Sequence, residues 1–532
     1  MKAKKLLCIL AAIVCLVGCL GGCKGETTKT SGKDSKKFTY WVEMPAQLAS
    51  VANSMSEVTL YKELEKKTGV EIEFIHAPSG QASEKFNLLV ASKNLPDMIE
   101  YNWKKYPGGP SKAIEDGIIY SLNDYVEKNA PDFWKIMQEY PNIRKDTVSV
   151  DGDYFGFPQI KLSSSNIYGG LMIRKDWLDD LGLEVPETID EWDTALRAFK
   201  TVKGVKAPLQ MEAGWFKVEG QGNNFNSAFG VDLGYYIDNG EVKLGPAEPG
   251  YKEYITLFHN WYKDGILDNE FDTLSGSAVE SRIMDGYSGA FFGYIGNAMG
   301  KYLSAKELTD KKFNLAGAQH PVKNKGDEPY FMSSVKSVSA PHVAITTSCS
   351  NPELAVNWMN NFYTNEGALL AQWGVEGLTY EIKEDGLRYF TDEIQNNPDG
   401  LSVFEAKAKH TRGYSTCPGV NIFLDSQEQK DLSIDQQYTY PQQVDALRTY
   451  SKYSENRKKT QVPDLEYDPK VASELSSLEF NINTYVYETV IRFITGDEPL
   501  SNYDKYLANL KKLKLDRVLE IKQAAYDKYM AN

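Results

Sequence analysis

The sequence predicts an α/β fold built from two successive blocks, with mostly parallel sheets and additional helices toward the C-terminus. Three observations support this class. Short β-favouring runs alternate with amphipathic helical stretches from residue 38 onward, the alternation restarts near residue 165, and the C-terminal part has mostly helical periodicity. Strands and helices that alternate at this length are typical of parallel β-α-β units with right-handed crossovers.

The first block contains three predicted strands separated by helices. Residues 38–42 favour β-structure at every position and predict a buried strand. The helix that follows ends at Gly69, and residues 70–74 then alternate apolar and acidic side chains, the period-2 pattern of a strand. A second helix is predicted around residues 86–90, and a third strand at 97–101.

The second block opens with a predicted strand at 171–173, followed by a helix that carries Trp177. Residues 188–191 form a capping box, because a Thr hydroxyl and a Glu carboxylate each bind a backbone N–H that the helix leaves unpaired. Residues 350–353 predict a second capping box. Apolar side chains then recur at helical spacing over 518–525.

The N-terminal segment predicts export. Three lysines precede an apolar run at 6–20, and small residues then lead to Cys23. This is the pattern of a lipoprotein signal, in which the cysteine is acylated. We interpret 1–22 as the signal peptide and 23–37 as a lipidated cysteine with a flexible, polar tether. Cys19 is an alternative lipidation site, and a plain anchor helix is the alternative interpretation. The expected location is the extracellular face of the cytoplasmic membrane.

Composition limits the function classes. The chain has 532 residues, 42% of them apolar and 25% charged, which is typical of a globular protein. Its net charge of −14 argues against nucleic acid as a partner, because phosphate backbones need a basic face. The five histidines have no metal-ligand spacing, so neither a metal nor another cofactor is predicted. Whether Cys349 and Cys417 form a disulfide is left open.

A family resemblance rests on turn-plus-helix motifs spread in order along nearly the whole mature chain. These motifs are 95–99 (LPDMI), 116–125 (DGIIYSLNDY), 152–158 (GDYFGFP), 173–183 (IRKDWLDDLGL), 188–192 (TIDEW), 261–267 (WYKDGIL), 351–355 (NPELA), 374–377 (GVEG) and 523–529 (QAAYDKY). With these motifs the chain resembles extracellular solute-binding proteins of family 1, the carbohydrate-binding lipoproteins of ABC importers, in their long Gram-positive branch. Residues 385–470 match this pattern least.

The resemblance implies a two-lobe, periplasmic-binding-protein-like (Venus flytrap) fold, with helices on both faces of each sheet. By analogy one lobe holds residues 38–162 and 338–375, and the other holds 163–337 and 376–532. Ligands of open α/β sheets bind beyond the carboxyl ends of the strands. The expected function is capture of a carbohydrate, an oligosaccharide, in the cleft between the lobes and its delivery to a membrane permease. We expect a monomer.

Candidate ligand-binding residues are aromatic or polar side chains at predicted strand ends and Gly-flanked loops, because rings cover the C–H faces of a sugar while carboxylates and amides bind its hydroxyls. They are Glu43, Tyr101, Asn102, Trp103, Trp215, Tyr294, Asn297, Trp373 and Glu376. Each has a structural alternative. The tryptophan and tyrosine after the third strand could be core residues, and Trp373 and Glu376 could pack at a hinge. Phe291 and Phe292 are expected in the core.

Two other classes of protein are alternatives to a carbohydrate-binding protein. An extracellular polysaccharide hydrolase needs two carboxylates about 5–10 Å apart across the scissile bond. With 73 acidic residues such a pair can always be nominated, so this argument has little force. No nucleophile elbow, zinc-protease pair or phosphate loop appears. A surface lipoprotein that binds peptides is the third class. The sequence favours a binding protein over an enzyme.

Overall fold

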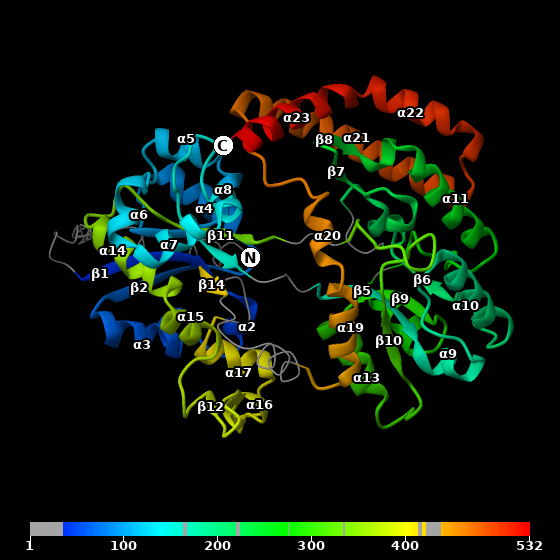
Figure 1. Cartoon of the computed structure of the whole chain (residues 1–532), viewed down its shortest axis with the longest axis horizontal. Coiled ribbons are helices and arrows are strands. Elements are labelled where there is room, and N and C mark those ends of the chain that lie inside the picture. The colour runs from blue at the N-terminus through cyan, green and yellow to red at the C-terminus, as the bar shows by residue number, and fades with distance from the viewer. Residues whose placement is uncertain are drawn as a thin grey trace, which may run out of the picture. The chain divides into compact units, whose positions relative to one another are not determined.

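The N-terminal part of the chain builds a six-stranded sheet. The computed structural model describes residues 36–162, 167–219, 224–274, 276–332, 336–412, 418–421 and 438–531. The strand order in this first sheet is β14-β4-β11-β3-β1-β2. The strands are β1 (Lys37–Glu43), β2 (Glu71–Ala77), β3 (Met98–Tyr101), β4 (Phe157–Lys161), β11 (Val338–Ile345) and β14 (Gly419–Asn421) (Figure 1).

Pairing in the first sheet is mainly parallel. β1 runs parallel to β2 and β3, and β14 runs parallel to β4. β11 is antiparallel to both of its neighbours, β3 and β4. The strands predicted at 38–42, 70–74 and 97–101 are confirmed, although the second extends to Ala77.

Both faces of the first sheet are buried. In β1, Tyr40 and Val42 belong to one core and Trp41 to another, because successive side chains of a strand point to opposite faces. The helices that contribute to the first core include α3 (Thr59–Thr68), α6 (Asn123–Asn129), α7 (Pro131–Glu139), α8 (Pro141–Thr147), α14 (Pro352–Asn360) and α15 (Asn365–Gln372). The helices of the other core are α4 (Ala82–Ser92) and α5 (Gly109–Glu115).

The second sheet has four strands in the order β10-β5-β9-β6. They are β5 (Gly169–Arg174), β6 (Leu209–Gln210), β9 (Ala290–Tyr294) and β10 (Leu315–Ala318). β5 is antiparallel to both β9 and β10, and only β6 and β9 pair in parallel. The prediction of mostly parallel sheets is therefore wrong for this sheet. A helix between two strands favours a crossover, but local periodicity does not determine which distant strand becomes the neighbour.

Helices from three parts of the chain surround the second sheet and the hairpin of β7 (Tyr235–Asp238) and β8 (Glu241–Leu244). Figure 1 shows the C-terminal helices beside α11, and contacts join α11 to α21 and α23 to β8. The helices are α9 (Lys175–Leu181), α10 (Ile189–Thr201), α11 (Pro249–Lys263), α12 (Gly276–Met284), α13 (Lys301–Lys306), α19 (Pro441–Ser451), α20 (Ser454–Lys458), α21 (Pro469–Thr495), α22 (Tyr503–Lys512) and α23 (Leu515–Ala531).

Helix α19 packs directly on β5. A Cβ added to Gly170 would lie 2.5 Å from the Tyr450 ring, so only glycine admits the ring at this position. The Tyr450 hydroxyl donates a hydrogen bond to the Leu171 carbonyl at 2.8 Å. Helix α19, which lies in the region of weakest family resemblance, is thus part of the core around the second sheet.

The first predicted capping box is confirmed and the second is wrong by one residue. The Thr188 hydroxyl accepts from the Glu191 N–H at 3.2 Å, and the Glu191 carboxylate accepts from the Thr188 N–H at 3.1 Å. At α14 the cap is Asn351, whose side chain accepts from the Leu354 N–H at 3.1 Å. The Pro at the first helical position moves the helix start one residue beyond the predicted one.

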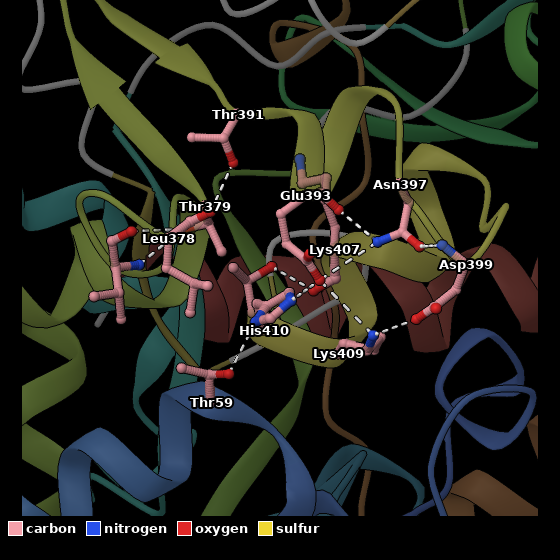
Figure 2. Close-up of polar contacts among 12 residues, drawn as sticks. Thr59, Leu378, Thr379, Thr391, Glu393, Asn397, Asp399, Lys407, Lys409 and His410 are labelled. Atoms are coloured by element: carbon pink, nitrogen blue, oxygen red, sulfur yellow. Dashed lines mark hydrogen bonds and ion pairs between the residues drawn. The ribbon is translucent and has the colours of Figure 1, made fainter.

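Residues 376–412 and 418–421 pack against elements of the first sheet, whereas the sequence assigned them to the second lobe. They include β12 (Tyr380–Ile382), β13 (Arg388–Phe390), α16 (Asp392–Gln395) and α17 (Val403–His410). α17 contacts α2 (Ala46–Ala49) and α3. In Figure 2, His410 bridges Thr59 and Glu393, with its Nδ1 2.9 Å from Thr59 Oγ1 and its Nε2 3.0 Å from Glu393 Oε1. We therefore propose that this segment belongs to the first lobe. The other lobe limits stay a prediction.

Two sequence expectations concern the anchor and the cysteines. None of the helices in the described ranges has the length and apolar character of a membrane span. Residues 1–35, which include Cys19 and Cys23, lie outside the described residues. Cys349 is buried as a free thiol, and Cys417 also lies outside the described residues.

We expect His342→Leu to weaken the pH dependence of stability. His342 on β11 is 3% exposed, and burial lowers its pKa to about 3, with Lys104 lowering it further and Asp464 opposing. Below pH ~6.5 the unfolded chain therefore binds a proton that the folded chain excludes, costing about 1.4 kcal/mol per pH unit down to pH ~3. Denaturant unfolding of wild type and variant at pH 7, 6 and 5 measures this slope. If the free energy of unfolding changed with pH by the same amount in wild type and variant, the prediction would be contradicted.

Candidate ligand-binding site

A polar hollow of about 740 Å³ is bounded by five segments that are distant in sequence. One is the short helix that follows β3 (Trp103–Lys105), and another is the segment that leads into β11 together with the start of that strand. The rest of the wall comes from the residues around β7, from the stretch after α20, and from α23. The side chains and backbone that line this polar hollow are Asn102, Lys104, Lys105, Glu219, Asn224, Asn226, Asp232, Leu233, Gly234, Tyr235, Phe331, Met332, Lys336, Ser339, Ala340, Arg457, Gln461, Val462, Pro463, Asp464, Leu465, Tyr467 and Lys522.

Several buried polar atoms in the wall of the polar hollow lack a hydrogen-bond partner among the described residues. They are Asn102 Oδ1, Asn224 Nδ2, the Tyr235 hydroxyl and Arg457 Nε. Asn224, Tyr235 and Arg457 are only 4%, 5% and 8% exposed. An unsatisfied buried polar group costs about 1–3 kcal/mol, so four of them around one hollow indicate a place where a polar ligand completes the bonding.

The wall of the polar hollow carries five cationic side chains and three carboxylates. Arg457 Nη1 pairs with Asp232 Oδ2 at 2.6 Å, and Lys336 Nζ pairs with Asp464 Oδ1 at 2.6 Å. Burial favours a higher pKa for Asp464, but Lys336 and Lys104 outweigh this effect and hold the pKa below its usual value. Asp464 therefore remains ionised near neutral pH.

A second hollow of about 610 Å³ adjoins the first and shares Asn102, Lys105 and Ala340 with it. We call it the Arg412 hollow. Arg412 Nη2 lies 2.9 Å from Glu100 Oε1, and the side chains of this buried pair are 2% and 3% exposed. The Tyr40 hydroxyl donates to the same carboxylate at 2.7 Å. This ion pair lies beside the carboxyl end of β3.

The structure brings three of the predicted residues to the hollows. Tyr101 and Asn102, at and just after the end of β3, line the Arg412 hollow together with Glu43 at the end of β1. Glu43 accepts a hydrogen bond from the backbone N–H of Gly80. Trp103 differs. It is 0% exposed, packs among the core side chains of the sheet, and donates its indole N–H to the Ile99 carbonyl at 3.3 Å. These contacts favour packing, the alternative that the sequence left open for Trp103, and a role in binding stays a prediction.

Trp215 and Tyr294 form an aromatic group with Phe292. The centroids of Trp215 and Phe292 are 5.2 Å apart, and those of Phe292 and Tyr294 are 5.6 Å apart. Tyr294 is 48% exposed, whereas Phe291 lies in the core as expected. Neither Trp215 nor Tyr294 lines the polar hollow or the Arg412 hollow. A role for this aromatic group in stacking on a ligand stays a prediction.

The remaining predicted residues have other placements. Asn297 falls in the helical turn Ile295–Gly300, but its side chain lies outside the described residues. Trp373 is 7% exposed and stacks on Phe390 at 4.4 Å. Glu376 pairs through its backbone with Tyr380. These contacts favour packing, the alternative that the sequence left open for Trp373 and Glu376.

Asn224, Tyr235, Arg457 and Arg412 were not predicted from the sequence. Arg457 and Arg412 lie in or near the region with the weakest family resemblance, and no local pattern marks them. Only pairing over long sequence distances, such as Arg412 with Glu100, brings these side chains to the hollows. Composition alone gave no signal for them.

The comparison with protein families identifies the chain. The family model described as bacterial extracellular solute-binding protein matches residues 49–369. The chain belongs to this family. The matched range includes the whole of β3, β5, β9 and β11, so it covers the central strands of both sheets of this solute-binding protein.

Curated relatives of the solute-binding protein cover much of its length. It is 24% identical over 501 residues to the fructooligosaccharide ABC transporter substrate-binding protein FusA of Streptococcus pneumoniae, covering 90% of this chain and 88% of FusA. It is 24% identical over 270 residues to the polygalacturonan/rhamnogalacturonan-binding protein YtcQ of Bacillus subtilis, covering 48% of this chain and 49% of YtcQ.

Solved structures confirm the fold. An HMO-binding, ABC-transporter-associated solute-binding protein from Bifidobacterium longum infantis superposes with a TM-score of 0.73 at 18% identity, covering 93% of this chain and 99% of that one. The alginate-binding protein AlgQ2 gives 0.66 at 22% identity, covering 93% and 98%. The predicted periplasmic-binding-protein-like α/β fold is therefore confirmed.

Proposed function

We propose that this solute-binding protein captures an oligosaccharide in the polar hollow and the adjoining Arg412 hollow and delivers it to an ABC permease. The observation that carries the proposal is the set of buried, unpaired polar atoms around one hollow, namely Asn102 Oδ1, Asn224 Nδ2, Tyr235 OH and Arg457 Nε. Sugar hydroxyls both donate and accept, so they can satisfy such a mixed set. The carbohydrate ligands named for FusA and YtcQ support the same class.

The proposed mechanism is closure around the ligand without bond making. Both hollows adjoin the segment that enters β11, since Ala340 lines each of them. We infer that β11 is one of the crossings between lobes, and that a few residues in such crossings absorb the dihedral change of a hinge. The exposed ring of Tyr294 and the half-buried ring of Trp215 are available to cover the apolar face of a sugar. Each added hydrogen bond then favours the closed state.

The proposed location is the outer face of the cytoplasmic membrane, with a diacylated Cys23 as the anchor and the polar segment after it as a tether. A membrane permease is the protein partner, and the solute-binding protein acts as a monomer. The signal pattern at 1–22 supports export, as does the extracellular family to which the chain belongs.

Calorimetry with purified protein and a panel of neutral and acidic oligosaccharides tests the proposal. We expect binding of at least one sugar with a negative heat-capacity change, and unaltered sugars when the same samples are analysed for products. Shortened sugars would instead indicate a hydrolase. If no sugar of the panel binds, the result would contradict the proposal and favour a protein that binds peptides.

Tyr235→Phe tests whether the polar hollow is the site. The variant removes a buried hydroxyl that has no partner among the described residues, so stability should be unchanged or slightly higher. Affinity for the bound sugar should fall about three- to tenfold, the value of one hydrogen bond. Tyr236→Phe is the matched control, because Tyr236 is the next residue of β7 and does not line the hollow. Equal affinity of both variants and the wild type would exclude the polar hollow.

A further inference from the structure

We propose that the captured oligosaccharide carries carboxylate groups, that is, uronate residues, and that Lys105 is a specificity-determining residue for them. This inference rests on the proposed function and names the chemical class of its ligand. It depends on two properties of the polar hollow, the excess of positive charge and the excess of hydrogen-bond donors without partners.

The excess positive charge lies on the short helix after β3. Three of the five cations in the wall are already paired with carboxylates, because Arg457 binds Asp232, Lys336 binds Asp464, and Lys522 Nζ lies 2.9 Å from Glu479 Oε1. The remaining cations are Lys104 and Lys105. Lys104 Nζ donates to the backbone carbonyl of Asp464 at 3.3 Å, and its charge also acts on the Asp464 carboxylate, whose pKa it lowers, so Lys105 is the cation of the wall without a nearby carboxylate partner in the described ranges.

Lys105 is the cation most available to a ligand. It is exposed, and among the described residues its ammonium group has neither a hydrogen bond nor an ion pair. It also lines both the polar hollow and the Arg412 hollow. In the Arg412 hollow the other cation, Arg412, is held by Glu100, so it contributes little net charge there. A carboxylate located where the two hollows meet would face Lys105.

The carboxylates in the wall leave this conclusion unchanged. Asp232 and Asp464 are each in an ion pair. Glu219 has no ion pair among the described residues, and burial of its carboxyl raises its pKa, which weakens its tendency to ionise. The net charge of −14 for the whole chain acts at longer range, where salt screens it over about 8 Å at physiological ionic strength. The local excess of positive charge at the polar hollow therefore determines which ligand charge is favoured.

The unpaired polar atoms also favour an acceptor-rich ligand. Asn224 Nδ2 and Arg457 Nε are donors, and the Tyr235 hydroxyl can donate. Asn102 Oδ1 and Asp232 Oδ2 only accept, but the latter already lies 2.6 Å from Arg457 Nη1. A neutral sugar offers hydroxyls that donate and accept in similar number. An ionised carboxylate only accepts, and hydrogen bonds to it are the stronger kind.

Titration with matched sugars tests the charge. The probes are linear trimers of galacturonate and of mannuronate, the methyl esters of both, and xylotriose. We expect one uronate trimer to bind at least tenfold more tightly than its own methyl ester and than xylotriose, and we expect this preference to weaken as salt is added.

Lys105→Gln tests the residue, with Lys128→Gln on α6 as a control at an exposed lysine outside both hollows. We expect Lys105→Gln to lower affinity for the uronate trimer about three- to tenfold, to leave the affinity for its methyl ester unchanged, and to flatten the salt dependence. The thermal midpoints of both variants should match the wild type.

Each other outcome has a distinct meaning. Binding of xylotriose or the esters as tightly as the uronates would overturn the charge inference and leave the proposed function standing. Equal losses in Lys105→Gln and Lys128→Gln would overturn the assignment to Lys105. If no sugar binds at all, the proposed function fails together with this inference.

Discussion

Arg412→Met is expected to lower the free energy of unfolding by about 3–5 kcal/mol, because it leaves the Glu100 carboxylate buried without its cation. Arg412 Nη1 contacts Glu100 Oε2 at 3.1 Å and the Tyr61 hydroxyl at 3.0 Å, while Nη2 contacts Glu100 Oε1 at 2.9 Å. Residues 100 and 412 are 312 positions apart, so this pair holds a late segment of the chain against the first sheet. Denaturant unfolding measures the loss.

Two further variants make the interpretation of Arg412→Met specific. Adding Glu100→Gln should restore at least half of the lost stability, since a neutral amide no longer needs a cation and still accepts from the Tyr40 hydroxyl. Arg517→Met removes a similar pair, Arg517 with Glu474, whose side chains are 38% and 42% exposed, and it should have no measurable effect. A loss for Arg412→Met as small as that for Arg517→Met would contradict the prediction.

Cys23→Ser is expected to abolish fatty-acid labelling of the protein completely. The thioether at this cysteine is the proposed attachment point, and serine cannot form it. A stable anchor needs two acyl chains, because one chain binds a membrane only marginally. Metabolic labelling with a fatty acid followed by detergent-phase partition measures the effect, and calorimetry on the soluble domain should show unchanged sugar affinity.

Cys19→Ser is the control for the lipid anchor, since Cys19 ends the alternative cleavage sequence. Full labelling of Cys19→Ser with none in Cys23→Ser supports Cys23. The reverse result would assign the lipid to Cys19. Label in neither variant nor the wild type would exclude lipidation, and export would then rest on the signal alone.

The local structure of the chain could be predicted where neighbours in sequence determine it. The apolar run at 38–42 and the alternation at 70–74 became β1 and β2, and the Thr188–Glu191 capping box starts α10. These features depend on residues at most a few positions apart, which a sequence displays directly. The capping prediction at 350–353 failed by one residue, because proline at the first helical position shifted the start to Asn351.

The candidate site could be predicted only in part. Tyr101 and Asn102, which line the Arg412 hollow, were predicted because a strand end marks the edge of a sheet where ligands bind, and their contact with a ligand stays a prediction. The side chain of Trp103, one residue further along the chain, lies in the core. The direction of a side chain just after a strand cannot be predicted from residue types alone. Arg457 and Asn224 reach the polar hollow from segments separated by more than two hundred residues, without any local signal.

By itself the sequence determined the α/β class, the family resemblance and the expectation of an exported, tethered protein, because periodicity, motif order and the N-terminal signal are all properties of short stretches. Only the tertiary structure decided that β5 pairs antiparallel with β9, that β14 joins the first sheet, and that Arg457 is paired while Lys105 has no counter-ion among the described residues. The physical reason is that strand partners and ion pairs are chosen by packing among distant segments, where burial and charge compensation act on the whole fold at once.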